Sequence, residues 1–522
     1  MTLWGCSQAT VTQSLISVTI TADQKELEIK IASGSTVAQV LEAGHIRLGE
    51  LDKIDPGLTV SLSDGAQIKV TRLKEEFYVI QEVIPFDHQE LKNEALPVGE
   101  RLLSQPGVNG LREITYNRVY EDGVEVSNSA VKTVVIRPAI PEIEMVGSQS
   151  MFAASPIPGT IAYLSAGNAW IIEGNTANHK LVVPTGDLDG RIFSLSRDGN
   201  YLLYTRFSKE ANVINSLWLA TLSSDPINFI DLGVKNIVRY AEINTSSNRI
   251  AYSTAEWREA SPGWQANNNL FEIDISTNGM INSHHQVLES NSGGVYGWWG
   301  TEFAWAPDQS RFLYSRPDGV GIISDSDKVP KFLYEITPFQ TGGNWAWVPG
   351  AAWSPDGSVI YSVSPVISVT TSTSQQFDLV AIPLVGGTPV NLVKNVGMFA
   401  YPEPSPLKQS SNLLDPLSGE AIKPAVFSVA YLQAVLPEQS ETSNYRLYVM
   451  DRDGSNPTAL FPKQEDSGLA PQRVAWSPST LREDGNLGIV LVYNGNIWII
   501  DAGTGDAEQV TGDGLTTRID WR

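Results

Sequence analysis

The chain has 522 residues, enough for two to four domains, and a formal net charge of −22 at neutral pH. That charge argues against nucleic acid as a partner, because nucleic-acid recognition depends on a basic surface. It also argues against direct binding to an anionic membrane, so membrane association is expected only through a lipid anchor. No stretch approaches the roughly 18 apolar residues that a membrane-spanning helix needs.

Residues 1–15 are predicted to be a tether that contains the single cysteine, Cys6. Its surroundings, Leu3-Trp4-Gly5-Cys6, resemble the lipobox of bacterial lipoproteins, in which the cysteine is lipidated. Trp4 stands where a small residue is usual, and the basic and apolar part of a signal peptide is missing, as a start codon placed too late would explain. The resemblance implies lipidation at Cys6, and the alternative is an accidental cysteine in a flexible tail.

Residues 16–73 are predicted to form a small mixed module. Strict alternation of apolar and polar residues predicts a hairpin over 17–31, and a capped apolar pattern predicts a helix over 37–43. A second hairpin is predicted over 59–71, across Asp64-Gly65. The order resembles a ubiquitin-like β-grasp module of the kind found in front of bacterial cell-wall-associated domains.

Residues 74–147 contain five glycines where turns or bends in a thin sheet need a residue without Cβ: Gly99, Gly107, Gly110, Gly123 and Gly147. With motifs such as Gln105-Pro106-Gly107-Val108-Asn109-Gly110, the segment resembles the five-glycine domain of bacterial surface proteins, an elongated β-rich module. The resemblance implies adhesion and contact with envelope polymers that contain N-acetylglucosamine. The alternative is a rigid spacer.

Residues 148–158 are predicted to be a linker, and a repeat follows it over 159–522. Its clearest copy is a strand that ends in Trp353-Ser354-Pro355-Asp356-Gly357, a tight turn followed by a second strand. Other copies lie near 193–199, 241–244, 303–308, 401–406, 474–478 and 518–521. Four strands per copy at a period of about 45–70 residues predict a mainly β protein with a β-propeller, and the repeat resembles that of TolB-like propellers.

The two ends of the repeat region are complementary. Strands are predicted at 160–164 and 168–172 without an inner strand before them, whereas the final inner strand at 518–521 has no strands after it. We therefore expect the C-terminal strand to complete the N-terminal blade, leaving no exposed edge. The copies then give seven blades, or six if the degenerate region around Tyr401 is not a blade.

The sequence shows no convincing catalytic or metal-binding pattern, so we expect a protein that is not an enzyme and has no cofactor and no metal. The five histidines are His45, His88, His179, His284 and His285, and none belongs to an HExxH or Cys/His motif. The His284-His285 pair is predicted to lie in a surface loop.

Six tryptophans in the long loops of the repeat region are the predicted ligand-binding residues: Trp257, Trp264, Trp298, Trp299, Trp345 and Trp347. Exposed rings with Asn, Gln and Gly neighbours suit a glycan or peptide site. The alternative is that they pack between blades, as Trp305, Trp353 and Trp476 of the repeat itself are expected to do.

These features predict a non-enzymatic binding or scaffold protein of the bacterial cell envelope, exported to the cell surface or periplasm. The small modules would contact or span the cell wall, and the propeller would present a partner-binding face. Two alternatives remain open: a carbohydrate-recognition protein that uses the Trp-rich loops, and an enzyme that acts at the central face of the propeller.

Overall fold

The computed structural model describes residues 14–522 except 94–95, 97, 148–151, 247, 277–280, 325–327, 342, 367–374, 408–412, 415–420, 423–425 and 483–484. Cys6 and most of the predicted tether lie outside these residues. The chain divides into two compact units, one holding residues up to Glu90 with Leu102–Glu144, the other Leu91–Arg101 with Met145–Arg522. Among the described helices, none is long and apolar enough to cross a bilayer.

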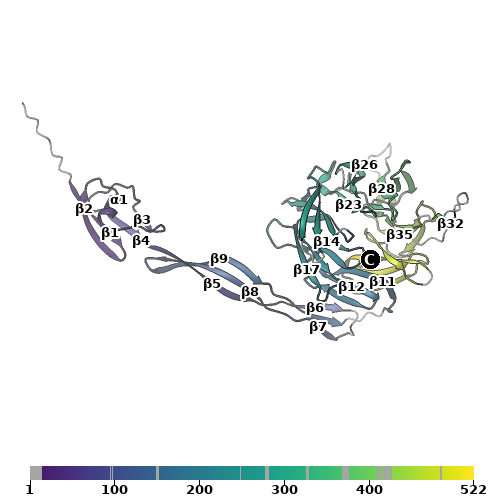
Figure 1. Ribbon diagram of the computed structural model, residues 1–522, viewed down its shortest axis with the longest axis horizontal. Coiled ribbons are helices and arrows are strands. Elements are labelled where there is room, and N and C mark those ends of the chain that lie inside the picture. The colour runs from purple at the N-terminus through teal and green to yellow at the C-terminus, as the bar shows by residue number, and fades with distance from the viewer. Residues whose placement is uncertain are drawn as a thin grey trace, which may run out of the picture. The chain divides into compact units, whose positions relative to one another are not determined.

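The first unit begins with a four-stranded sheet in the order β2-β1-β4-β3, covered by one helix (Figure 1). The elements are β1 (Leu15–Ala22), β2 (Lys25–Ala32), α1 (Val37–Ala43), β3 (Lys53–Asp55) and β4 (Gln67–Thr71). Apolar residues of β1, α1 and β4, including Val18, Val37 and Ile68, are buried together. The predicted first hairpin and the helix over 37–43 are confirmed.

The predicted second hairpin over 59–71 is wrong. Strand β4 pairs in parallel with β1 and antiparallel with β3, so residues 59–62 are not its partner. The backbone of that segment serves the helix instead: the N–H of Val37 donates to Val60 O at 3.0 Å, and that of Ala38 to Leu58 O at 3.0 Å. These bonds satisfy donors in the first turn of α1 that have no partner inside the helix.

A second sheet of the first unit contains β5 (Leu73–Ile84), β8 (Gly110–Glu121) and β9 (Val124–Arg137) in the order β5-β8-β9. Strand β9 is exposed along its whole length, so this sheet is a single layer. Gly123 turns the chain between β8 and β9 at φ 83°, and a Cβ on Gly110 would lie 2.5 Å from Ala139 N. A further sheet, β6-β10-β7, is built from β6 (His88–Asn93), β10 (Glu142–Gly147) and β7 (Arg101–Gln105).

In the described part of the second unit, seven sheets of at least four strands follow one another, grouped around a common centre in Figure 1. The first two sheets contain β41 (Thr516–Trp521), β11 (Pro156–Ser165), β12 (Asn168–Asn175), β13 (His179–Val183); and β14 (Leu188–Leu195), β15 (Tyr201–Phe207), β16 (Asn215–Thr221), β17 (Asn228–Lys235). The third and fourth contain β18 (Ile237–Asn244), β19 (Arg249–Trp257), β20 (Trp264–Ala266), β21 (Leu270–Ile275), β22 (Ile281–Leu288); and β23 (Glu302–Trp305), β24 (Arg311–Arg316), β25 (Gly319–Ser324), β26 (Pro330–Glu335).

The remaining three sheets lie between Ala351 and Gln509. They contain β27 (Ala351–Trp353), β28 (Val359–Pro365), β29 (Phe377–Pro383), β30 (Val390–Val393); β31 (Glu403–Pro404), β34 (Ser428–Ala434), β35 (Tyr445–Asp451), β36 (Thr458–Phe461); and β37 (Ala475–Thr480), β38 (Leu487–Tyr493), β39 (Asn496–Asp501), β40 (Ala507–Gln509). The degenerate region around Tyr401 thus contributes a first strand, β31, which pairs with β34. Two further short strands, β32 (Leu413–Leu414) and β33 (Ala421–Ile422), pair with each other.

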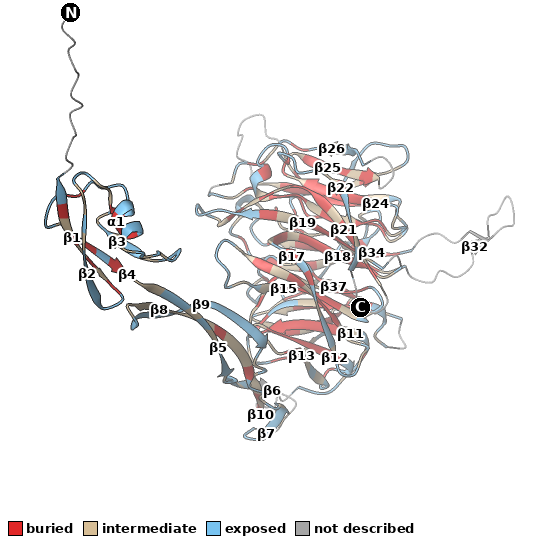
Figure 2. Cartoon of the chain, turned by 60° about the vertical axis from the view of Figure 1, so that its left-hand side comes forward, coloured by how far each residue is buried: buried red, intermediate tan, exposed pale blue. Residues whose placement is uncertain are grey.

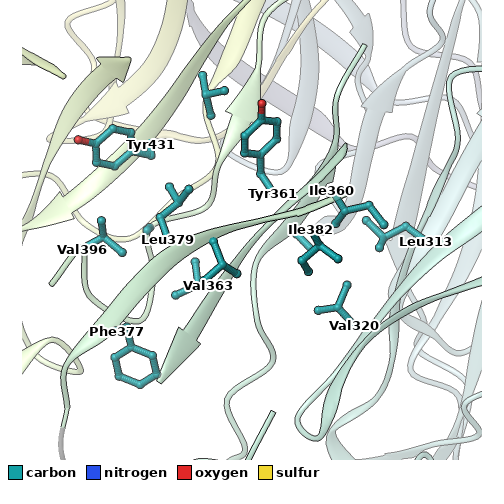
Figure 3. Close-up of a cluster of buried hydrophobic side chains, with 14 of the residues drawn as sticks. Leu313, Val320, Ile360, Tyr361, Val363, Phe377, Leu379, Ile382, Val396 and Tyr431 are labelled. Atoms are coloured by element: carbon teal, nitrogen blue, oxygen red, sulfur yellow. The ribbon is translucent and has the colours of Figure 1, made fainter. Parts of the chain in front are cut away.

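The core of the second unit lies between its sheets, where buried strands concentrate (Figure 2). Figure 3 shows one such cluster, in which Ile360, Tyr361 and Val363 of β28 and Leu379 of β29 lie among Leu313 and Tyr431 of neighbouring sheets. The predicted core tryptophans Trp305, Trp353 and Trp476 are buried.

The repeated turn is held by one hydroxyl and one carboxylate. Ser354 Oγ donates to Asp356 Oδ1 at 2.6 Å and accepts the backbone N–H of Val359 at 3.0 Å. Ser196 and Asp198 repeat the first contact at 2.6 Å in another copy. The Ser-x-Asp pair therefore fixes the turn that joins the first two strands of a sheet.

The C-terminal strand completes the N-terminal sheet, as the sequence predicts. Strand β41 pairs antiparallel with β11, with Trp521 opposite Ile161. The pairing continues past the strand, where Thr160 N donates to Arg522 O at 2.6 Å and Arg522 N to Thr160 O at 3.0 Å. The Trp521 side chain is 0% exposed, and its Nε1 donates to Pro158 O at 2.7 Å.

We expect Trp521→Ala to lower the free energy of unfolding by about 3–5 kcal/mol, since it leaves a cavity in the first sheet and removes a buried hydrogen bond. Urea denaturation followed by fluorescence measures the loss. The matched control is Trp257→Ala, whose side chain is 42% exposed and which should cost less than about 1 kcal/mol. Equal losses in the two variants would contradict a structural role for the β11–β41 pairing.

Candidate functional site

The first strands of the seven sheets bring charged side chains together at the centre of the second unit. Several of these strands contact one another: β41, β14, β18 and β23 form one run, β37 contacts β41, and β27 contacts β31. We call the group formed by Arg239, Glu302, Tyr401, Glu403 and Arg473 the central cluster. Its members come from the third, fourth, sixth and seventh sheets or the residues just before them.

Arg473 contacts three other members of the central cluster. Its Nη1 lies 2.7 Å from Glu403 Oε1, and its Nη2 lies 3.2 Å from Glu302 Oε2. The guanidinium also lies over the Tyr401 ring, 5.3 Å from the centroid. A single arginine therefore links sheets whose residues are 171 positions apart in the chain.

Arg239 extends the network outward. Its Nη1 lies 3.7 Å from Glu302 Oε1, and its Nε donates to the backbone oxygen of Trp299 at 2.7 Å. The same guanidinium lies 5.8 Å from the centre of the Trp264 ring. The central cluster is thus joined directly to the predicted tryptophan-rich loops.

Burial raises the pKa values of two side chains of the central cluster, Glu403 and Tyr401. Desolvation raises the pKa of Glu403 above its ordinary value, against the opposing charge of Arg473. Desolvation also raises the pKa of Tyr401 to about 12, with the Glu302 carboxylate acting in the same direction. Because Arg473 keeps 41% of its side chain exposed, the cluster remains open to solvent, and its donors and acceptors can meet a polar ligand.

A second set of acids holds neighbouring first strands together. Asp520 Oδ2 accepts the Leu195 N–H at 2.8 Å, and Glu242 Oε2 accepts the Trp305 N–H at 3.1 Å. In each case the carboxylate of one sheet bonds the backbone of the next. Burial raises the pKa of Glu242, and the bond from Trp305 opposes that shift.

Four of the six predicted tryptophans form one group, the aromatic cluster: Trp257, Trp264, Trp298 and Trp299. Trp264 is 6% exposed and packs edge-on against Trp299, with ring centroids 6.0 Å apart. Trp298 Nε1 donates to Trp264 O at 2.8 Å, while 38% of Trp298 stays exposed. Trp257 pairs with Trp264 across β19 and β20 and is also exposed. The buried Trp264 and the half-buried Trp299 thus support two rings that reach solvent.

Trp345 and Trp347 pack in a different cluster, around the fourth to sixth sheets. Trp347 is 1% exposed, and its Nε1 donates to Met398 O at 2.8 Å. Trp345 is half-buried and stacks on Phe399 with ring centroids 6.0 Å apart. In this structure, therefore, Trp347 has no free ring face for a ligand, and these two residues lie outside the aromatic cluster.

A cavity of about 390 Å³ lies between the third and fourth sheets, lined by residues that include Asn268, Thr301, Tyr314 and Arg316. Asn268 Nδ2 donates to Gly297 O at 2.9 Å, and Gly297 begins the short helix η1 (Gly297–Trp299) that carries Trp298. The polar wall of the cavity and the aromatic cluster are therefore parts of one hydrogen-bonded loop structure.

Sequence reasoning missed the central cluster. One signal that could have found part of it is an acidic residue two positions before the turn in three of the repeats. Glu242, Glu403 and Asp520 occupy that position, where the other copies have Ser194, Ala304, Ala352 and Ala475. A second signal lies two positions earlier in the repeat, where aligned copies carry Glu302, Tyr401 and Arg473, all members of the central cluster.

The structure corrects the placement of His284 and His285, which lie in strand β22 rather than in a loop. His285 Nε2 lies 2.7 Å from Asp274 Oδ2. His179 is close to Tyr163, with 2.7 Å between Nδ1 and the hydroxyl, and burial lowers the pKa of its imidazole. His88 contacts a carboxylate of the first unit.

Comparison with known proteins identifies two domains in the first part of the chain. Residues 75–149 match the family model described as G5 domain, and residues 18–59 match the G5-linked-Ubiquitin-like domain. The chain thus carries a G5 domain and a ubiquitin-like domain in front of a mainly β unit.

Among curated proteins, the chain is similar to resuscitation-promoting factor RpfB of Mycolicibacterium smegmatis, with 28% identity over 27% of this chain and 40% of that protein. The chain therefore spans about two fifths of the length of this relative. Similar solved structures include the β-propeller domain of the Trilobed protease of Pyrococcus furiosus, with 14% identity, TM-score 0.37 and coverage of 62% of this chain and 84% of the other. A putative TolB of Agrobacterium tumefaciens is 17% identical, with TM-score 0.30 and coverage of 59% and 90%.

We expect Glu242→Gln to become more stable relative to the unchanged protein as pH rises. The raised pKa of Glu242 means that the folded state binds more protons than the unfolded chain above the ordinary value of 4.5, so its contribution to stability falls as pH increases through that window. Glutamine removes this titration and keeps an oxygen for the Trp305 N–H. Urea denaturation at several values between about pH 4.5 and about pH 7.5 measures the difference.

The control is Glu210→Gln, which changes an exposed carboxylate paired with Lys235 at 2.6 Å. Its stability should follow the pH dependence of the unchanged protein in the same window. Parallel curves for Glu242→Gln and the unchanged protein would show that Glu242 does not titrate as proposed.

Proposed function

We propose that this chain is a non-enzymatic bacterial envelope protein that is exported and associated with the cell wall. In this proposal the G5 and ubiquitin-like domains contact wall polymers that contain N-acetylglucosamine or hold the chain away from them. The seven sheets of the second unit form a closed seven-bladed propeller that presents a partner-binding face, and Cys6 is the site of a lipid anchor.

One observation carries the proposal. The similarity to RpfB covers only 27% of this chain and lies over its G5 part, whereas most of the rest of the chain is a seven-sheet unit. An N-terminal module shared by proteins with different remaining parts is best explained by a common location. The central cluster supports a binding role for the second unit, because its charged groups, although paired with one another, remain partly exposed to solvent.

We expect the full chain to sediment with purified peptidoglycan, whereas a chain of residues 152–522 stays in the supernatant. The shorter chain lacks Leu91, Leu96 and Met145, which belong to the second unit and pack in its core, so its near-ultraviolet circular dichroism must first be shown to match a folded state. A chain that begins at Leu73 tests whether the ubiquitin-like domain is needed. Equal sedimentation of 152–522 and the full chain, or no sedimentation of either, contradicts wall association through the G5 region.

Carbohydrate recognition by the aromatic cluster is a second candidate function. It is favoured by the exposure of Trp257, Tyr296 and Trp298 within one loop region of the third sheet. Polar groups surround these rings: Arg258 lies 6.0 Å from the centre of the Trp298 ring and bonds Gln265 at 2.8 Å. Such rings bury the apolar face of a sugar while the polar neighbours orient its hydroxyl groups.

If this candidate is correct, Trp257→Ala and Trp298→Ala each weaken binding of oligomers of N-acetylglucosamine by about tenfold or more, equivalent to about 1.4 kcal/mol. Isothermal titration calorimetry measures the affinity, and thermal unfolding should show only small losses of stability. Phe229→Ala is the matched control, since that ring is 42% exposed on β17. Unchanged affinity in both tryptophan variants removes the aromatic cluster as a sugar site.

A further inference from the structure

Two neighbouring strands, β6 and β10, place one histidine and three carboxylates of the first unit together. His88 and Glu90 are two residues apart on β6, and Glu142 and Glu144 are two residues apart on β10, the adjacent strand. Side chains two apart in a strand lie on the same face of a sheet. All four groups belong to the first unit, and the link from Asp87 O to the N–H of Glu142 at 2.8 Å fixes the two strands in register here.

The distances give the two nitrogens of His88 different roles. Nδ1 lies 2.8 Å from Glu142 Oε1, whereas Nε2 lies 4.0 Å from Glu144 Oε2. A proton on Nδ1, donated to Glu142, leaves the lone pair of Nε2 directed toward the Glu144 side. A carboxylate that holds one ring nitrogen while the other binds a cation is the usual second contact of a metal-bound histidine.

Ligand atoms of His88, Glu90 and Glu144 all lie within 4.8 Å of one another. Such a group needs only small side-chain rotations to reach a single ion at the distance of about 2.0–2.2 Å that zinc requires. One imidazole with carboxylate oxygens is a donor set for zinc and other divalent transition metals, whereas calcium and magnesium prefer oxygen ligands alone. The ion would also offset the mutual repulsion of three nearby carboxylates.

We propose that His88 Nε2, Glu90 and Glu144 bind one divalent transition-metal ion, with Zn²⁺ the best match, and that Glu142 orients His88 as a positioning residue. The site lies within one chain and ties β6 to β10, which are 54 residues apart in sequence at His88 and Glu142. Half of the His88 side chain is exposed, so water completes the coordination and the ion exchanges with solvent. The proposal does not depend on the wall-binding function.

The test is calorimetric titration of the full chain with ZnCl₂, in a Cys6→Ser background that removes the only thiol. We expect one Zn²⁺ per chain. His88→Gln should weaken binding by about 100-fold, and Glu142→Gln by about 10-fold, as losses of a ligand and of its orienting partner do. Titration with Co²⁺ should give an optical absorption that disappears in His88→Gln.

The matched control is His285→Gln, because His285 also lies in a strand and also contacts a carboxylate, that of Asp274. It should bind Zn²⁺ as the unchanged chain does. Zn²⁺ should also raise the melting temperature of the unchanged chain but not that of His88→Gln, which shows that a variant is folded yet does not bind. The proposal is overturned by no binding, by full binding in His88→Gln, by loss of binding in His285→Gln, or by one ion shared between two chains.

Discussion

The antiparallel pairing of β11 with β41 is the interaction on which the second unit depends. It joins segments more than 350 residues apart in the chain and supplies the innermost strand of the first sheet. The first sheet therefore contains strands from both ends of the second unit, and the other six sheets lie between those ends in sequence. Without β41, strand β11 would expose an unpaired edge, and Leu195 would lose its bond to Asp520. The β11–β41 pairing therefore fixes both the hydrogen bonds of the first sheet and the contacts that β41 makes with the first strands β14 and β37.

The arrangement of the first strands determines the chemistry at the centre. Charges that are far apart in sequence meet there, where burial makes each of them costly unless it is paired. Arg473 meets this condition by bonding two glutamates from different sheets, and Arg239 bonds one of them as well. The network also stays partly exposed, with 41% of the Arg473 side chain accessible to solvent, so its charges keep part of their hydration while they are paired.

The sequence predicts well those features that depend on residues close together in the chain, and poorly those that depend on residues far apart in it. The Ser-x-Asp turns, the strands they join and the helix over 37–43 arise from neighbouring residues, and all are confirmed. The predicted hairpin over 59–71 is wrong because backbone oxygens of residues 58–60 accept hydrogen bonds from N–H groups in the first turn of α1. That contact is tertiary and cannot be deduced from the neighbouring residues. The central cluster and the group around His88 were missed because their members are joined only by the fold, across 171 and 54 residues. Likewise, alternation alone cannot tell which member of the Trp257–Trp264 pair is buried.

The two units differ in the kind of binding that their architecture allows. The β5-β8-β9 sheet has no second layer over β9, so its strands are held by backbone hydrogen bonds and cross-strand pairs such as Tyr78 on Tyr116, with ring centroids 5.4 Å apart. A single layer cannot enclose a ligand, and any partner must lie along its exposed faces, as an extended polymer does. The second unit, by contrast, has a cavity, supported aromatic rings and a paired charge network. Under the proposed function, therefore, the first unit is suited to an extended polymer and the second unit to a compact ligand.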